Sequence, residues 1–223
     1  MSIELTFLGH SAFLITSGDH RVAIDPFLTD NPTASMKAED LEVSAIVLTH
    51  GHPDHMGDAE SIAKKRLATV YAPFEVCSYL GNQLDEANLE PANPGGRVDA
   101  PFGFVAFTQA VHSASHDGRY MGVASGIVLN IGGKTIYHAG DTALFSDMKL
   151  IGELYKPDVA ILPVGDRFTM GPEHAAIAAE WVGAPIAVPC HFGTWPLLRS
   201  DISAFTPKGV EVRKLTPGQS FTL

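Results

Sequence analysis

Short apolar runs separated by polar and glycine-containing turns follow one another along most of the 223 residues. Such runs, about four to eight residues long and bounded by turn residues, are typical of β-strands. A Gly132-Gly133 pair between two later runs is a strong signal for a hairpin turn. The pattern predicts strands at Ile3–Leu8, Ala12–Thr16, Val22–Ile24, Ala45–Thr49, Thr69–Ala72, Phe104–Gln109, Ile127–Ile131, Thr135–His138, Val159–Pro163 and Ile186–Pro189.

Segments with helical periodicity alternate with the later strands. The pattern predicts one helix that starts at Pro53 and continues through Asp58–Lys65, and further helices at Pro73–Leu80, Ser146–Tyr155 and Pro172–Val182. A strand meander followed by strand-helix units favours an α/β (α+β) architecture, with two mixed sheets covered by helices on their outer faces. The length favours a single domain over residues 1–223.

The charge balance narrows the classes of partner. Fifteen Lys and Arg against 25 Asp and Glu give a formal net charge of −10. A chain of this charge has no overall field that attracts nucleic acid or an anionic membrane. No secretory signal pattern or long apolar run is apparent, which predicts a cytoplasmic protein without membrane contact. The two cysteines, Cys77 and Cys190, are too few for a disulfide framework, so we expect both to be reduced and packed in the core.

The segment HGHPDH concentrates three of the ten histidines and one aspartate into six positions. His50 and His52 leave the end of an apolar strand, where alternate residues point the same way, so both imidazoles face one point. Pro53 keeps His52 extended and lets a helix begin immediately afterwards. Asp54 and His55 then lie in the first helical turn and reach a different side of the pocket.

This geometry predicts two adjacent metal positions served by one short segment. Imidazole and carboxylate ligands suit zinc, manganese or iron, and the absence of a thiolate cluster argues against a zinc ribbon or an iron-sulfur site. An exposed histidine-rich loop is the plain alternative. The order of strand, ligands, proline and helix favours the metal site, because that is the context in which such motifs occur.

The H-x-H-x-D-H run resembles the defining motif of the metallo-β-lactamase superfamily. Further residues typical of that family appear in the expected order: Asp25 in AIDPF before the run, and His112 in QAVHS, Asp141 in YHAGDT and His191 in VPCHFGT after it. The stretches GHSAFLI, KTIYHAGDTALFSDM and FTMGPEHAA are most similar to the small bacterial and archaeal metal-dependent hydrolases of that superfamily. The resemblance implies a four-layer αββα sandwich with a dinuclear metal site at one edge of the sheets.

The resemblance also implies which residues bind the metals. It assigns His50, His52 and His112 to the first ion, and Asp54, His55 and His191 to the second, with Asp141 bridging the two. His116 lies four residues beyond His112 and competes with it as the third ligand of the first ion. We favour His112, because it stands closer to the end of the preceding strand and matches the family pattern.

Three further polar residues are candidates for contacts behind the ligands or along the substrate pocket. Asp25 follows a strand, where it would fix the tautomer of a ligand imidazole, or would serve only as a turn residue before Pro26. His10, at the end of the first strand, either faces the pocket or occupies a turn. His138 precedes the AGD turn and is expected behind the ligands or in the core.

The ligand set predicts an enzyme with two divalent ions, with zinc favoured and manganese or iron as alternatives. A hydroxide bound by both ions would cleave an ester, lactone, amide or phosphoester bond of a small-molecule substrate. Asp54 would be catalytic as well as a ligand, by orienting that hydroxide. A mononuclear or di-iron redox enzyme, a nuclease and a metal-binding module without catalysis are the alternative functions. The sequence leaves open the substrate and whether copies associate as a homo-oligomer.

Overall fold

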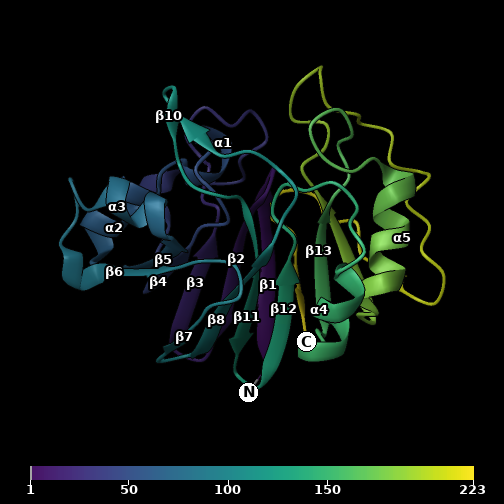
Figure 1. Cartoon of the computed structure of the whole chain (residues 1–223), viewed down its shortest axis with the longest axis horizontal. Coiled ribbons are helices and arrows are strands. Elements are labelled where there is room, and N and C mark those ends of the chain that lie inside the picture. Colours follow the sequence, from purple (N-terminus) through teal and green to yellow (C-terminus); the bar gives the residue numbers. More distant parts are fainter. Residues whose placement is uncertain (1) are drawn as a thin grey trace.

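Two seven-stranded sheets pack face to face in the computed structural model, which describes residues 2–223 (Figure 1). Antiparallel pairing joins the first strands of the first sheet, and parallel pairing joins its later ones. In spatial order this sheet contains β16 (Ser220–Thr222), β1 (Ile3–Gly9), β2 (Ala12–Ser17), β3 (His20–Ile24), β4 (Ala45–Val47), β5 (Thr69–Pro73) and β6 (Leu89–Ala92).

The second sheet is also mixed, with parallel pairing from β12 to β15. In spatial order it contains β15 (Glu211–Val212), β14 (Ile186–Cys190), β13 (Val159–Pro163), β12 (Lys134–His138), β11 (Ser125–Ile131), β8 (Gly103–Gln109) and β7 (Arg97–Ala100). A separate two-stranded ribbon joins β9 (Ser115–His116) to β10 (Arg119–Tyr120).

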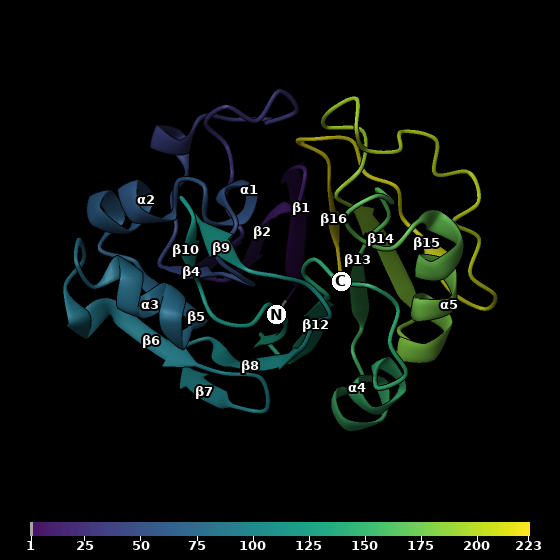
Figure 2. The same cartoon turned by 45° about the horizontal axis from the view of Figure 1, so that its top comes forward.

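Helices cover the outer face of each sheet (Figure 2). The helices are α1 (Pro53–Met56), α2 (Ala59–Arg66), α3 (Phe74–Leu80), α4 (Met148–Tyr155) and α5 (Pro172–Val182), with short 3-10 turns η1 (Ala38–Asp40) and η2 (Glu86–Asn88). The first three flank the first sheet, and α4 and α5 flank the second. This arrangement confirms the predicted four-layer αββα sandwich.

Alternation along the strands builds three apolar layers. In β2, Phe13 and Ile15 point into the space between the sheets, whereas Ala12 and Leu14 face the helices. In β8, Phe107 likewise packs between the sheets while the neighbouring Ala106 faces the helices of the second sheet. Since both faces of the strands are covered, they read in the sequence as nearly continuous apolar runs.

The predicted helix from Pro53 to Lys65 is wrong in one respect, because the chain breaks it at Gly57 and Asp58. Gly57 has φ +41°, and a Cβ there would overlap the backbone of Pro26 and Phe27. The Asp58 carboxylate accepts hydrogen bonds from the backbone N–H groups of Leu28 (2.9 Å) and Thr29 (2.8 Å). These contacts hold the loop that follows β3. They require a turn at Gly57 and Asp58, so the helix cannot continue through these residues.

The ten predicted strands are all present, with ends that differ by at most two residues. β4 ends two residues early, because the Thr49 N–H turns away to donate to Asp25 Oδ1 at 2.8 Å. Six strands were not predicted from the sequence: β6, β7, β9, β10, β15 and β16, which have two to four residues each and lie in the ribbon or toward the sheet edges. Cys77 and Cys190 are unpaired and buried, as expected.

No helix among residues 2–223 is both long enough and apolar enough to cross a bilayer.

The six strands that precede the candidate residues, β1, β3, β4, β8, β12 and β14, run in the same direction and end at one edge of the sandwich, at the top of Figure 1. In the first sheet β3 and β4 are parallel, and β1 runs the same way because two antiparallel pairings separate it from β3. The same reasoning aligns β8 with β12 and β14 in the second sheet. Residues that follow these strands therefore gather at one edge.

The layer between the sheets predicts a large difference between two phenylalanines. Phe107 is 0% exposed between the sheets, whereas Phe74 at the start of α3 is 54% exposed. We expect Phe107→Ala to lower the free energy of unfolding by about 3–5 kcal/mol, because it leaves a cavity. Phe74→Ala, the matched control, should change it by less than about 1 kcal/mol. Urea unfolding followed by circular dichroism measures both, and similar losses would contradict this packing.

Candidate metal centre

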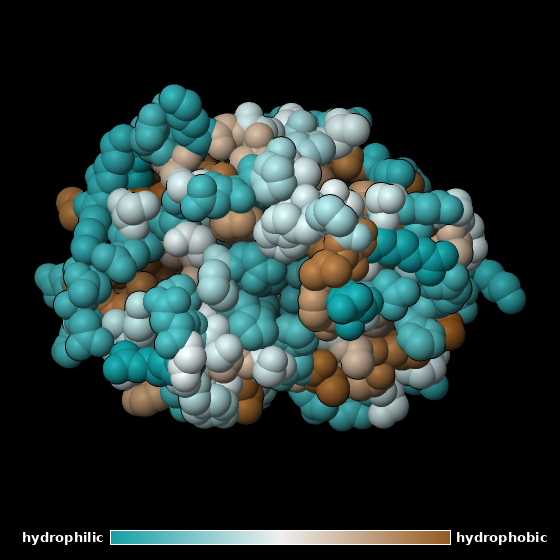
Figure 3. Space-filling model, turned by 90° about the horizontal axis from the view of Figure 1, so that it is seen from above, coloured by the Kyte–Doolittle hydropathy of each residue, from teal (hydrophilic) through white to brown (hydrophobic). Residues whose placement is uncertain are grey.

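Strand ends deliver the candidate residues to the common edge. His10 follows β1, Asp25 follows β3, and His191 follows β14 directly. Asp141 and His112 come three residues after β12 and β8, respectively. The HGHPDH segment connects the end of β4 to α1, with Pro53 at the first helical position as predicted. Figure 3 views this edge from above and shows hydrophilic side chains over most of its centre, with apolar patches beside them.

Three of these residues adopt left-handed backbone conformations that non-glycine residues rarely take. The φ angles are +56° for His10, +45° for Asp25 and +54° for His191. A conformation of this kind costs about 1–3 kcal/mol and persists only where the surroundings impose it, often at functional sites. The His191 N–H donates to the His10 carbonyl at 2.8 Å, so two of the three strained residues support each other.

His50, His52 and His112 form one group of converging imidazoles. His50 Nε2 and His52 Nδ1 are 3.0 Å apart. The His112 ring stands nearly perpendicular to both, with centroid distances of 5.3 Å to His50 and 5.1 Å to His52. One nitrogen from each ring lies within 4.8 Å of the other two. This is the set predicted for the first ion.

His116 lies outside this group. Its Nε2 is 3.7 Å from the Asp117 carboxylate, and its ring packs against Tyr79 with a centroid distance of 5.2 Å. Of the two candidates for the third ligand, the structure therefore brings only His112 together with His50 and His52.

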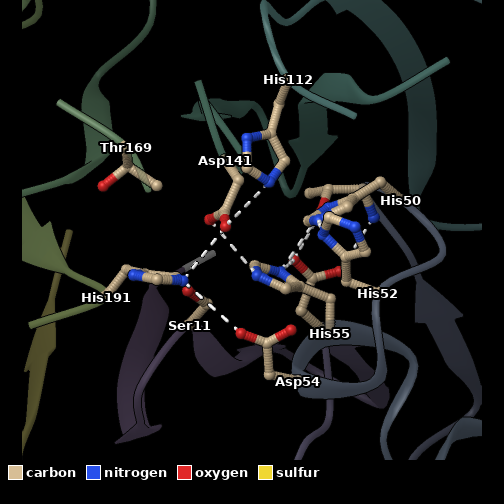
Figure 4. Close-up of polar contacts among 12 residues, drawn as sticks. Ser11, His50, His52, Asp54, His55, His112, Asp141, Thr169 and His191 are labelled. Carbon is tan, nitrogen blue, oxygen red and sulfur yellow. Dashed lines mark hydrogen bonds and ion pairs between the residues drawn. The ribbon is translucent and has the colours of Figure 1, made fainter. Parts of the chain in front are cut away.

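A second group contains Asp54, His55 and His191, with His10 beside them. Asp141 lies between the two groups (Figure 4). Its carboxylate oxygens are 3.2 Å from His55 Nε2, 3.1 Å from His191 Nε2 and 3.6 Å from His112 Nε2. A single carboxylate thus contacts one imidazole of the first group and two of the second.

Asp25 fixes the His55 imidazole from behind. Its Oδ2 lies 2.7 Å from His55 Nδ1, and both residues are fully buried. The Thr49 N–H and hydroxyl also donate to this carboxylate, at 2.8 and 2.7 Å. Since the carboxylate only accepts, Nδ1 carries the proton in the neutral ring, and Nε2 is left with a lone pair that faces the cluster.

The centre contains several buried polar atoms without hydrogen-bond partners. They are His55 Nε2, Asp141 Oδ1 and both ring nitrogens of His191. Buried polar atoms are normally paired, because an unpaired one costs about 1–3 kcal/mol. Imidazole nitrogens and carboxylate oxygens that converge in this way are the ligands that divalent transition metals prefer. The donor set therefore fits metal ions.

The electrostatics of the cluster also favour a cation. Burial disfavours charge on His55 and His191, but the Asp141 carboxylate raises the pKa of His55 well above its ordinary value and that of His191 to about 9. Burial likewise opposes ionisation of Asp141, yet His191 and His55 hold its pKa well below the usual range. In contrast, burial and His191 lower the pKa of His10 to about 4. A field that adds protons to buried imidazoles attracts divalent cations to the same lone pairs.

The contacts behind the candidate ligands involve Ser125 and Thr194, which were not predicted from the sequence, and His138, which was expected there or in the core. The Ser125 hydroxyl donates to the Thr49 carbonyl at 2.6 Å, and the Thr194 hydroxyl lies 2.8 Å from His10 Nδ1. His138 accepts a hydrogen bond from the Gly140 N–H at 3.0 Å and holds the turn before Asp141. No sequence signal pointed to Thr194, since 184 positions separate it from His10.

Comparisons with known proteins agree with this geometry. A family model described as a beta-lactamase superfamily domain matches residues 20–192. The chain is 46% identical to a UPF0173 metal-dependent hydrolase of Bacillus mycoides over 99% of this chain and 100% of the relative. It is 49% identical to a UPF0173 metal-dependent hydrolase of Anoxybacillus flavithermus, over 91% and 92%. Igni18, described as a novel metallo hydrolase from Ignicoccus hospitalis, superposes with a TM-score of 0.90 and 35% identity, covering 100% and 99% of the chains.

Close packing behind His191 gives a test of the site. A Cβ on Gly165 would overlap the His191 carbonyl oxygen. We expect Gly165→Ala to lower the free energy of unfolding by about 1–3 kcal/mol through overpacking, and to reduce the metal content by displacing His191. Gly81→Ala is the control, because no atom there would lie closer than 3.4 Å. Urea unfolding and elemental analysis provide the readouts. A stability and metal content equal to those of the parent in Gly165→Ala would contradict the placement of His191 as a metal ligand packed against Gly165.

Proposed function

The chain belongs to the metallo-β-lactamase superfamily and, within it, to the UPF0173 metal-dependent hydrolases, and on this premise we propose that it uses two divalent ions to hydrolyse a small-molecule substrate. The bond cleaved is an ester, lactone, amide or phosphoester. The observation that carries the proposal is the position of Asp141, whose carboxylate contacts His112 of one ligand group and His55 and His191 of the other.

Each of the two groups of candidate ligands would bind one ion. His50, His52 and His112 would hold the first, and Asp54, His55 and His191 the second, with the Asp141 carboxylate between them. When bound, the ions would lower the pKa of a shared water and polarise the bond under attack. Asp25 would keep His55 Nε2 free to coordinate by holding the proton on Nδ1.

Asp54 is the carboxylate best placed to act on the attacking water. Its side chain is 26% exposed, against 3% for Asp141 and 0% for Asp25. Burial opposes ionisation of Asp54, but the imidazoles of His10, at 3.1 Å, and His191, at 3.6 Å, hold its pKa well below the usual range. An ionised carboxylate at the mouth of the site would accept a hydrogen bond from the water and orient it for attack.

The charge of the chain supports a small substrate. The formal net charge of −10 counts against a nucleic acid as the substrate. Zinc is the favoured ion, because it accepts mixed imidazole and carboxylate ligands with an open position.

The function is tested by loading the protein separately with zinc, manganese and iron and assaying lactones, esters, amides and phosphoesters. Turnover of one class by the zinc or manganese form supports the proposal. An optical spectrum of bound iron in the protein as purified, with turnover only under redox conditions, would favour the redox alternative instead. No turnover by any form, with both ions bound, would count against hydrolysis of these bonds.

Metal stoichiometry gives a prediction that does not depend on the substrate. We expect about two ions per chain in the parent, about one in His50→Ala and in His191→Ala, and weak retention of both in Asp141→Asn, because a neutral amide does not balance two cations. His174→Ala, on the exposed start of α5, should retain both and is the control. Elemental analysis after gel filtration measures the content. Two ions retained in all of these variants would contradict the ligand sets.

A second prediction concerns Asp54 and requires a substrate found in the panel. At saturating metal, Asp54→Asn should lower turnover by at least about a hundredfold, the scale of positioned proton-transfer groups. Stability should fall by less than about 1 kcal/mol beyond any metal effect, since the Asn amide keeps an oxygen acceptor for His10 and α1 loses only a first-turn charge. Asp117→Asn, on the exposed ribbon near the site, is the matched control. Turnover within a few-fold of the parent would refute a catalytic role for Asp54.

A further inference from the structure

His10 is a buried histidine that the proposed ligand sets do not use. It is 1% exposed, and its ring lies against His191 with a centroid distance of 4.1 Å and against Trp195 at 4.8 Å. Both ring nitrogens have polar partners. Nδ1 is 2.8 Å from the Thr194 hydroxyl, and Nε2 is 3.1 Å from Asp54 Oδ2.

The partners decide which nitrogen carries the proton. The Asp54 carboxylate is ionised and can only accept, so a contact of 3.1 Å with His10 Nε2 requires a proton on that nitrogen. A neutral ring then has a lone pair on Nδ1. A hydroxyl donates as readily as it accepts, so the Thr194 O–H donates to Nδ1 and stabilises this tautomer. Thr194 is 7% exposed, so little water competes for the bond.

We propose that His10 is a positioning residue whose Nε2–H, kept on that nitrogen by the Thr194 hydroxyl, holds the Asp54 carboxylate in place for the second ion and for the attacking water. This inference rests on the proposed function, in which Asp54 is both ligand and orienting group. It excludes a role for His10 as a further ligand through Nε2, although its position within the second ligand group would permit one.

The backbone of His10 supports the same assignment. Its carbonyl accepts the N–H of His191, and both residues have positive φ. One residue at the end of β1 therefore fixes two ligands of the second group, Asp54 through its side chain and His191 through its main chain. Gly9 before it has φ +118°, and a Cβ there would lie 2.7 Å from the Thr33 carbonyl oxygen, so this bend of the chain is closely constrained.

The tautomer of His10 provides the direct test. Long-range ¹H–¹⁵N correlation spectra of the zinc-loaded protein report which nitrogen of each histidine is protonated, and the His10 signals are those missing in His10→Phe. We expect the proton on Nε2 and a lone pair on Nδ1. A proton on Nδ1 with zinc on Nε2 would overturn the inference and make His10 a ligand.

Metal affinity provides the second readout. With a competing chelator, His10→Phe should weaken one of the two zinc ions by about 10–100-fold and leave the other unchanged, the usual effect of losing a residue that orients a ligand. Thr194→Val, which keeps the imidazole, should weaken the same ion to a smaller extent, and Thr194→Ser should match the parent. Affinities within about twofold of the parent in both His10→Phe and Thr194→Val would refute positioning.

These outcomes remain separate from those of the proposed function. If the parent binds two ions but hydrolyses nothing, the hydrolase proposal fails while the tautomer and affinity results still decide the role of His10. If His10→Phe does not fold, Thr194→Val and the tautomer of the parent decide it alone. A loss of both ions in Thr194→Val, together with a lower melting temperature of the metal-free protein, would indicate a general structural role and overturn the inference.

Discussion

The contact between the Asp25 carboxylate and the His55 imidazole joins the first sheet to the candidate metal centre. Both side chains are fully buried, and two donors from Thr49 complete the partners of the carboxylate. A buried carboxylate without such partners would be strongly unfavourable. The same contacts end β4 early, set the tautomer of His55 and aim its free nitrogen at Asp141. One set of hydrogen bonds therefore determines both where β4 ends and which nitrogen of His55 is free to bind a cation.

The common direction of six strands explains why distant segments meet at this point. Each sheet contributes strand ends to one edge, and the chain must turn sharply there to aim a side chain inward. His10, Asp25 and His191 make these turns with positive φ. Backbone strain of this kind is tolerated because the apolar layers on both faces of each sheet hold the strands in place.

The fold was largely predictable from local patterns. The ten predicted strands are apolar because both of their faces are covered, and a run of apolar residues can be recognised in the sequence without knowledge of the fold. The edge strands carry no such signal, since β9, β10 and β15 have two residues each and are stabilised by pairing rather than by burial. The break between α1 and α2 could not be predicted either, because it depends on the fit of Gly57 against Pro26 and Phe27, which lie far from it in the sequence.

The candidate ligands also differ in how readily they could be predicted from the sequence. His50, His52, Asp54 and His55 were identifiable because one strand end and one helical turn determine where all four point. His112, Asp141 and His191 stand alone at strand ends, so the residues themselves gave weaker signals and the family resemblance supplied their roles. Thr49 and Thr194 gave none, because a hydroxyl becomes informative only when packing brings it to a buried imidazole. Candidate metal ligands can thus be read from a motif, whereas the residues that contact them from behind depend on how the two sheets meet.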